Sequence, residues 1–202
     1  MKIVGVHTLI SCGPYARSLH WAATRSQIHA AVRSCTWPPG NDKFTIYPQS
    51  GKKRDEGNGV GPIKKEFVNE LQTRGWKIEG PSKNLIGQAL GDFDAVLPGP
   101  VNPIVAEWET GNISSSHRSM NKLTMLVADK VISAGSLIVP SRKLYVFLTD
   151  RIGNIQELEP YFRLWKSVPC QEGILEVVVI EHDAESYEVP KIPKMTAGRA
   201  RG

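Results

Sequence analysis

The sequence contains little cysteine. Cys12, Cys35 and Cys170 are the only three in 202 residues, and they lie far apart. Neither a CxxC pair nor a nearby histidine pattern accompanies them, which argues against both a disulfide framework and a zinc site. We expect three free thiols in a reducing compartment.

Long apolar runs are also missing. No stretch approaches the roughly 20 apolar residues that a membrane-spanning helix needs. The amino end, Met1 to Val4, does not lead into the continuous apolar segment of a secretion signal. We therefore expect neither secretion nor membrane insertion, and a cytoplasmic location.

A nucleotide-binding loop is not favoured either. The segment from Ser50 to Gly61 contains four glycines, but no GK[ST] follows and no clear strand precedes it. Its charge and glycine content predict a mobile loop. Three basic residues in this loop either contact the DNA backbone or are simply solvated, and the sequence leaves both readings open: Lys52, Lys53 and Arg54.

Length and charge set only broad limits. A chain of 202 residues is long enough for one domain with a substantial core, and we place this domain at residues 1–183. The net charge of +5 is compatible with nucleic acid binding but does not establish it. We expect residues 184–202, a basic segment with prolines, to be a disordered tail that adds phosphate affinity or does nothing.

The strongest signal lies between Phe93 and Arg118. In the run Val105-Ala106-Glu107-Trp108-Glu109 a strand would place both glutamates on one face and Trp108 on the other. Turn-forming residues at 98–103 separate this run from an earlier one, Asp92–Leu97. The pattern predicts a hairpin that sets Asp94 opposite Glu107.

Three crowded carboxylates repel one another, and Mg²⁺ prefers oxygen ligands of this kind. A bound divalent ion can acidify a water and polarise a phosphoryl oxygen, as phosphodiester hydrolysis requires. The cluster of Asp94, Glu107 and Glu109 therefore indicates a metal-dependent nuclease. The alternative is a solvated acidic edge of a hairpin, because acids often alternate on exposed strands.

A helix with a buried stripe follows the acids. The break at residues 110–112 is followed by serines that can cap a helix running to about Ser133. Free N–H groups at a helix start attract phosphate, so this start would lie beside the acids as a DNA-binding element. Asn112 is a candidate for reading a base edge. The candidate DNA-binding residues here are Asn112, Ser114, Ser115, Ser116, His117 and Arg118.

These residues resemble the type II restriction endonucleases grouped around BglII, BamHI and BstYI, a branch of the PD-(D/E)xK nucleases. The resemblance depends on Asp94 before Glu107-Trp108-Glu109 and on Asn112 three positions after the last acid. A looser likeness covers about residues 15–182 and includes the segment 63–77. The glutamate at position 109 stands where most of the superfamily has a lysine, a departure that also occurs within this group.

The resemblance implies roles for the acids. Asp94 and Glu107 would bind Mg²⁺ with the Trp108 carbonyl, although Asp92 is an alternative to Asp94. Glu109 would activate or position the water, provided that its neighbours raise its pKa. Asn112 would read a base with Ser114 beside it. A further polar residue on the preceding helix is assigned to Glu66, with Glu70 in reserve, and either can be plain helix surface.

The predicted fold is α/β, a restriction-endonuclease-like mixed β-sheet flanked by helices. The predicted protein is a symmetric homodimer that cuts each strand of a palindrome in double-stranded DNA once. The resemblance implies that this palindrome contains GATC and that a DNA methyltransferase is a possible partner. Two rivals remain, a catalytically silent DNA-binding or interaction protein and a Mg²⁺-dependent repair nuclease of low specificity.

Patterns elsewhere predict alternating strands and helices. The expected strands are 2–9, 44–47, 137–139 and 174–180. The expected helices are 15–35, with Leu19, Ala22, Ala23, Ile28 and Val32 toward the core; one from Pro62 to Gly75; one capped by Ser141; and a run from Gly153-Asn154 to Trp165. Arg142, Lys143 and Arg151 line the DNA cleft or serve only solubility.

Overall fold

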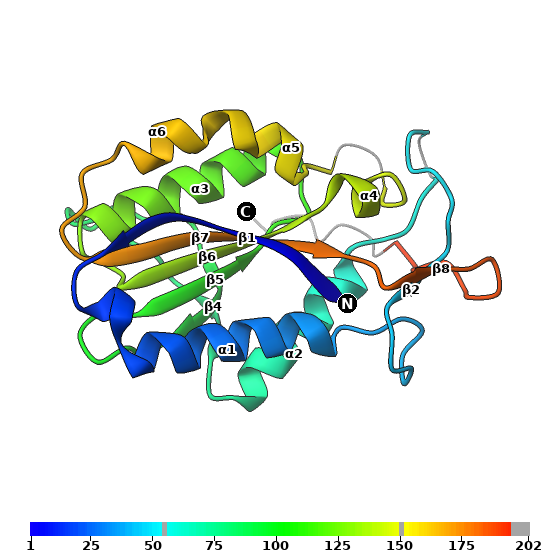
Figure 1. Cartoon of the computed structure of the whole chain (residues 1–202), viewed down its shortest axis with the longest axis horizontal. Coiled ribbons are helices and arrows are strands. Elements are labelled where there is room, and N and C mark those ends of the chain that lie inside the picture. Colours follow the sequence, from blue (N-terminus) through cyan, green and yellow to red (C-terminus); the bar gives the residue numbers. More distant parts are fainter. Residues whose placement is uncertain (54–55, 150–151, 195–202) are drawn as a thin grey trace.

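A mixed six-stranded sheet lies at the centre of the molecule (Figure 1). The computed structural model describes residues 1–53, 56–149 and 152–194. Across the sheet the strands are β1 (Lys2–Cys12), β7 (Gly173–Glu181), β6 (Ala134–Pro140), β5 (Ile104–Trp108), β4 (Phe93–Leu97) and β3 (Lys77–Gly80). The pairs β7–β6 and β6–β5 are parallel, and the outer pairs are antiparallel.

Helices cover both faces of this sheet. One face carries α1 (Leu19–Ser34) and α2 (Gly61–Thr73), and the other carries α3 (Ile113–Ala128), α5 (Ile155–Leu158) and α6 (Phe162–Lys166) (Figure 1). All seven residues of β6 are buried, as expected for a parallel strand covered on both sides. The α/β class and the mixed sheet are confirmed.

The alternation of side chains divides the core into two layers. On β7, Ile174 and Val178 pack toward α1 and α2, whereas Leu175 and Val177 pack toward α3 and α6. Short elements complete the chain: η1 (Tyr15–Arg17), α4 (Arg142–Tyr145), η2 (Glu159–Tyr161), and a two-stranded parallel sheet of β2 (Thr45–Ile46) and β8 (Ala184–Glu185).

Helix α1 faces the core with a different set of residues from the one predicted. Leu19 is 90% exposed, and Ala22 and Ala23 are also exposed, so these three assignments are wrong. Ile28 and Val32 are fully buried, as predicted. Leu19 is the first residue of the helix and faces solvent, because the buried stripe begins at Trp21 and continues through Thr24 and Ala31.

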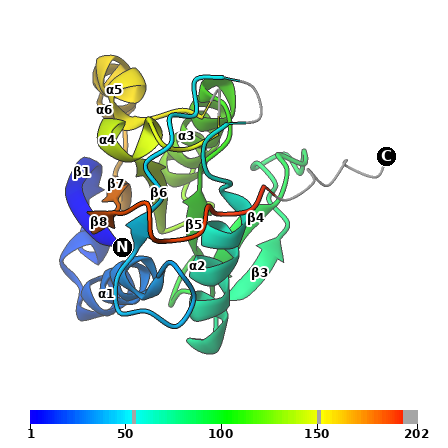
Figure 2. The ribbon, with the colours of Figure 1, turned by 90° about the vertical axis from the view of Figure 1, so that its right-hand side faces the viewer.

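Residues 184–194 are held to the rest of the molecule at β8 and at Ile192. Ile192 is 1% exposed, its N–H donates to Asn58 Oδ1, and its carbonyl accepts from the N–H of Gly59. Figure 2 follows this segment from β8 across the molecule toward α2. The expected disorder is therefore wrong for these residues, and residues 195–202 lie outside the described part. The single domain over residues 1–183 stays a prediction.

The glycine-rich loop is held against the same region. Gly51, Gly57 and Gly59 are buried, and the N–H of Gly51 donates to Val146. A methyl group on Gly51 would lie 1.5 Å from the Leu148 carbonyl oxygen. These glycines allow close approach of two backbones, which is a packing role rather than phosphate binding. The predicted mobile loop is packed at these positions.

No helix in the described ranges is long and apolar enough to cross a membrane.

Candidate active site

The β4–β5 hairpin brings two carboxylates together. The strands are antiparallel with Ala95 opposite Ala106, and one step further along this register sets Asp94 opposite Glu107, as predicted. The N–H of Trp108 donates to Asp94 Oδ2 at 2.8 Å. The N–H of Asp94 donates to Glu107 Oε2 at 3.3 Å. The two acids are thus fixed by each other's strand.

Alternation along β5 separates the acids from the aromatic residue between them. Trp108 is 3% exposed and packs on Phe67 of α2, with ring centroids 4.8 Å apart. Glu107 points the other way, toward α3, where Lys122 meets it. Glu109 follows the strand and also reaches α3, because its Oε2 accepts from Ser119 Oγ at 3.2 Å.

Two lysines from different helices contact the acids. Lys64 of α2 places its Nζ 2.5 Å from Asp94 Oδ1. Lys122 of α3 places its Nζ 2.5 Å from Glu107 Oε1. Lys122 also donates to the Asp92 carbonyl at 3.0 Å. The acid pair is therefore bracketed by two ammonium groups.

Burial shapes the ionisation of Glu107. Its exposed fraction is only 6%, and removal from water raises its pKa above the ordinary value. The ammonium group of Lys122 opposes this shift, and the neighbouring charge of Asp94 adds to it. Glu107 is thus a buried carboxylate with the Lys122 ammonium group beside it. Burial also favours binding of a metal cation, because the cation would offset the unfavourable removal of the carboxylate charge from water.

Glu109 is shifted in the same direction. Burial raises the pKa of Glu109, while the N–H of Gly111 and the hydroxyl of Ser119 stabilise its ionised form and reduce the shift. The Gly111 contact is 2.7 Å long. The charge of Asp94 raises the pKa further, and Lys64 lowers it. A carboxyl group with a raised pKa is a better proton acceptor than an ordinary glutamate.

All three acids open onto one cleft of about 1290 Å³. Its lining comes from the end of the hairpin, α2, the segment before β4 and α3. The residues that line it are Val60, Lys64, 89–92, Asp94, 107–111, Ser114, Ser115, 117–119, Asn121, Lys122 and Met125.

The amino end of α3 lies at this cleft, but its cap differs from the prediction. Asn112 caps the helix, since its Oδ1 accepts from the N–H of Ser115 at 3.0 Å. The predicted serine cap is therefore wrong, and the helix ends at Ala128 rather than near Ser133. An asparagine accepts this bond as well as serine does. Asn112 remains exposed.

The other predicted residues of this helix divide into two groups. Ser114, Ser115, His117 and Arg118 line the cleft. Ser116 is 1% exposed and faces Gly153, where an added methyl group would lie 2.8 Å from its Oγ. Ser116 was predicted to contact DNA, and its burial is incompatible with that role in this conformation. One side of a helix at a groove necessarily faces inward.

Glu66 lies away from the acids. Its carboxylate accepts from the N–H of Thr36 at 3.0 Å, beside the end of α1. Glu70, the reserve, pairs with Arg74 on the surface of α2. Neither lines the cleft. The assignment of Glu66 to the site is thus not supported by its position. Glu66 lies two residues after Lys64, and residues two apart on a helix do not share a face.

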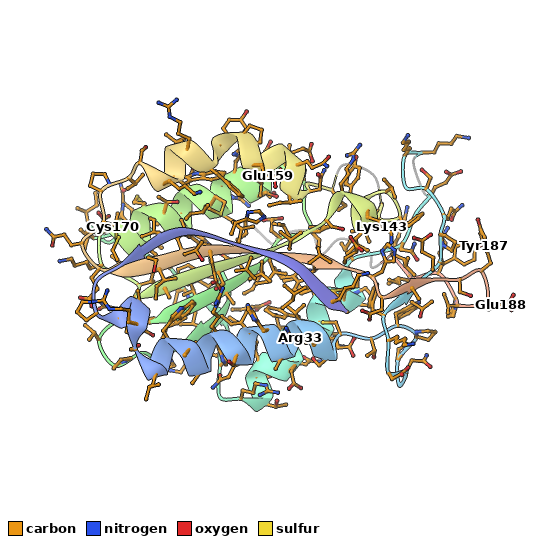
Figure 3. All side chains as sticks on the ribbon, in the orientation of Figure 1. Arg33, Lys143, Glu159, Cys170, Tyr187 and Glu188 are labelled. Atoms are coloured by element: carbon orange, nitrogen blue, oxygen red, sulfur yellow. The ribbon has the colours of Figure 1, made fainter. Side chains whose placement is uncertain are left out.

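Of the predicted basic residues outside α3, the four that the structure describes do not line the cleft: Lys52, Lys53, Arg142 and Lys143. Lys52 and Lys53 are exposed in the glycine-rich loop, and Arg54 falls outside the described residues. Lys143, labelled in Figure 3, lies 3.8 Å from Glu181 and 3.9 Å from Glu185. Arg142 stacks on Tyr145, and Arg151 is likewise outside the described part.

Sequence reasoning missed three residues that contact the acids. They are Lys64, Ser119 and Lys122. Glu79 is exposed on β3, in register opposite Asp94, with a left-handed φ of 56°. The spacing of α3 contained a usable signal, because Ser119 and Lys122 are three residues apart and share a face.

The donor set fits a hard divalent cation. Two carboxylates offer oxygen ligands, and each already has one oxygen against a positive charge. Within the described ranges, no group of three or more His, Cys, Asp or Glu side chains is arranged to hold a metal ion. Mg²⁺ commonly takes only one or two carboxylates and completes its shell with waters and substrate.

Comparison with known proteins gives consistent matches. The family model described as "BamHI: Restriction endonuclease BamHI" matches residues 1–199. The type II restriction enzyme OkrAI of Oceanobacter kriegii is 43% identical over 175 residues, which cover 87% of this chain and 88% of that relative. The type II restriction enzyme BamHI of Bacillus amyloliquefaciens is 33% identical over 185 residues, which cover 87% of this chain and 82% of that enzyme.

A solved structure matches the fold. The restriction endonuclease BglII, complexed with a DNA 16-mer, aligns with a TM-score of 0.60 at 12% sequence identity. The alignment covers 91% of this chain and 79% of that chain. The predicted restriction-endonuclease-like arrangement of sheet and helices is thereby confirmed.

Proposed function

Because this chain belongs to the BamHI restriction endonuclease family and is a type II restriction enzyme, we propose that it cuts both strands of a short DNA palindrome in a Mg²⁺-dependent reaction. The family implies a divalent metal cofactor in general. The observation that carries the proposal is the convergence of Asp94, Glu107 and Glu109 in one cleft beside the amino end of α3.

The acids take different roles in this proposal. Asp94 and Glu107 would hold the metal with the Trp108 carbonyl, and the bound ion would polarise the phosphate and acidify a water. The strand contacts between Asp94 and Trp108 and between Glu107 and Asp94 keep both carboxylates in place before substrate arrives. Such preorganisation avoids reorganisation during the reaction.

Glu109 is the proposed proton acceptor. In hydrolysis the water oxygen bonds to phosphorus and the bond from phosphorus to the 3′ oxygen breaks, which yields a 5′-phosphate and a 3′-hydroxyl. The water loses one proton, and the leaving oxygen gains one from solvent. Glu109 accepts the first proton at its carboxylate, and the raised pKa makes that transfer more favourable.

The amino end of α3 would bind the DNA backbone and read a base. Its free N–H groups favour phosphate, and Ser114 and Arg118 line the cleft beside it. Asn112 would donate from its amide NH₂ to a base acceptor, while its oxygen continues to cap the helix. The resemblance to the BglII, BamHI and BstYI group implies a GATC centre for the site.

A second copy of the chain completes the proposal. A twofold dimer matches a palindrome and cuts each strand once. A cytoplasmic methyltransferase of the same specificity would protect the host DNA.

The proposal is tested by digesting mixed-sequence plasmid with the protein in Mg²⁺ and sequencing the fragment ends. We expect discrete fragments with 5′-phosphates and one palindrome at every end, and none from Glu107→Ala. A smear would indicate a low-specificity nuclease, and a retarded but intact plasmid would indicate a silent binder. Either result would reject the proposed function.

A further inference from the structure

Lys64 is a positively charged side chain that contacts one of the acids at the cleft. Its Nζ lies 2.5 Å from Asp94 Oδ1, and the side chain is 43% exposed. It lines the same cleft as Glu107 and Glu109. Its charge also reaches Glu109, whose pKa it lowers. Lys64 thus contacts Asp94 and is accessible to a ligand in the cleft.

Helix α2 aims this lysine at the cleft. Ile63, Phe67 and Leu71 are buried at four-residue spacing and fix the helix on the sheet. Lys64 follows Ile63 and lies at the edge of that buried face, where Val60, one turn earlier, also lines the cleft. The rigid packing of α2 therefore positions the lysine stem, while the ammonium group stays at the opening.

The second lysine is placed differently. The side chain of Lys122 is 9% exposed, and its Nζ is enclosed by Glu107, by the Asp92 carbonyl and by the ring of Phe93 at 4.6 Å. This group stabilises the buried Glu107 and has little freedom to reach a ligand. Of these two ammonium groups, that of Lys64 has the exposure a substrate contact needs.

The negative charge at position 109 leaves the site without a positive group there, a role that the Lys64 ammonium group can take. Position 109 carries a glutamate where most of the superfamily has a lysine. The carboxylate of Glu109 is bound by the Gly111 N–H and the Ser119 hydroxyl, and so places a negative charge there. Negative charge increases on phosphoryl oxygens in the transition state of hydrolysis, and a positive group aimed at them is stabilising.

We propose that Lys64 is a catalytic residue, whose ammonium group contacts a non-bridging oxygen of the scissile phosphate and supplies the positive charge that position 109 lacks. This inference rests on the proposed function, because it requires DNA in the cleft. Before DNA binds, the ammonium group remains on Asp94. The alternative role is purely local, in which Lys64 only neutralises Asp94 and leaves it when a metal binds.

The test compares Lys64→Met with Lys65→Met. Lys65 is the next residue of α2, with the same charge, but is exposed and does not line the cleft. The substrate is a duplex containing the palindrome found by end sequencing, cut by excess enzyme in Mg²⁺. We expect Lys64→Met to lower the single-turnover rate constant by about 10²–10³-fold, the usual loss for one such donor. Lys65→Met should cut at the wild-type rate, and Lys64→Arg should recover part of the loss.

A second readout does not depend on cleavage. Binding of the same duplex without metal is measured over a range of salt concentrations. Loss of one phosphate contact should reduce the slope of log affinity against log salt by about 0.9. We expect this reduction for Lys64→Met and an unchanged slope for Lys65→Met. Thermal melting of each variant establishes that it is folded, and Lys64→Gln replaces Lys64→Met if the latter does not fold.

Wild-type cleavage by Lys64→Met with an unchanged salt slope would overturn the inference, because Lys64 would then only neutralise Asp94. A reduced rate with an unchanged slope would also overturn it, since a positioning role would explain that result. If Glu107→Ala is inactive while Lys64→Met cuts normally, the proposed function stands and this inference fails. If the wild-type protein does not cut, the proposed function fails first.

Discussion

The ionisation of Glu109 depends on its surroundings. Burial raises its pKa, and two hydrogen bonds and Lys64 limit the shift. A carboxyl group with a raised pKa in the folded state binds protons more tightly there than in the unfolded chain. Its contribution to stability is therefore fully present below the unfolded pKa and is lost as pH rises through the folded pKa.

This linkage predicts the behaviour of Glu109→Gln without metal. The amide removes the ionisation but keeps an acceptor for the Gly111 N–H. At neutral pH we expect the variant to have a higher Tm than the wild type. In a chain of this size each kcal/mol of unfolding free energy gained raises Tm by about 2–4 °C. The difference should shrink as pH falls toward 4.5, the ordinary pKa of the group. Calorimetry between pH 4 and 8 measures it, and a difference that grows toward low pH would contradict the assignment.

Lys122 gives a second prediction at this scale. Its side chain and that of Glu107 are 9% and 7% exposed, so removal of the ammonium group leaves a buried carboxylate without its cation. We expect Lys122→Met to cost about 3 kcal/mol of unfolding free energy in urea. The double variant Lys122→Met/Glu107→Gln should recover most of that loss, and full additivity of the two changes would show that the pair is not coupled.

The acids were predictable from sequence and the lysines were not. Asp94 and Glu107 are 13 residues apart in one hairpin, whose turn formers and strand alternation are local features. Lys64 reaches Asp94 from a helix 30 residues earlier. Many exposed lysines have the same local pattern, and only the packing of α2 on the sheet distinguishes this one. The sequence likewise does not show which way Glu66 faces on α2, and this is why it is a candidate from sequence although it lies away from the acids.

At the scale of elements, helix α3 joins stability to recognition through one residue. Asn112 caps the helix with its oxygen and is the proposed base reader with its NH₂ group. Asn112→Ala should cost about 1 kcal/mol, as is usual for loss of a cap, whereas Ser114→Ala should be nearly neutral.

Asn112→Asp separates the two roles, because aspartate caps as well as asparagine but offers no NH₂ donor. We expect Asn112→Asp to keep wild-type stability in urea and to lose discrimination between the palindrome and a sequence changed at one base pair. Retained discrimination would remove Asn112 from base reading, whatever the stability shows.

The contact between the glycine-rich loop and the carboxyl-terminal segment gives the next prediction. A methyl group on Gly59 would lie 2.1 Å from the Pro193 carbonyl oxygen. We expect Gly59→Ala to cost about 1–3 kcal/mol by forcing the segments apart. Gly5→Ala is the matched control, because its nearest contacts, at 3.5 Å, are ordinary. Equal stability of the two variants in urea would contradict the packing described for residues 190–193.

This contact also explains why the tail was mispredicted. Polar, proline-containing composition indicates disorder locally, yet Ile192 is buried by segments far away in sequence. Asn58 and Gly59 hold it through backbone contacts, which composition does not reveal. Helix α1 gives a second example. Its periodicity correctly predicted that Ile28 and Val32 are buried, but it did not predict the buried residues at the amino end of the helix.

On the scale of the whole molecule, the two helical layers have different tasks. The layer of α1 and α2 supplies Lys64 and fixes Trp108, and the layer of α3 supplies Ser119 and Lys122. The acids lie where the hairpin meets both layers. The hairpin is local in sequence, but the cleft is lined by α2 and α3 as well, so the cleft forms only in the complete fold.

The most direct measurement is the single-turnover cleavage rate of a duplex containing the palindrome, compared among Asp94→Ala, Glu107→Ala, Glu109→Ala and Glu66→Ala in Mg²⁺. The proposed site predicts losses of at least about 10²-fold for the first three. Glu66→Ala should cut at the wild-type rate, because its carboxylate binds Thr36 away from the cleft. Undiminished cleavage by any of the first three variants would contradict the account.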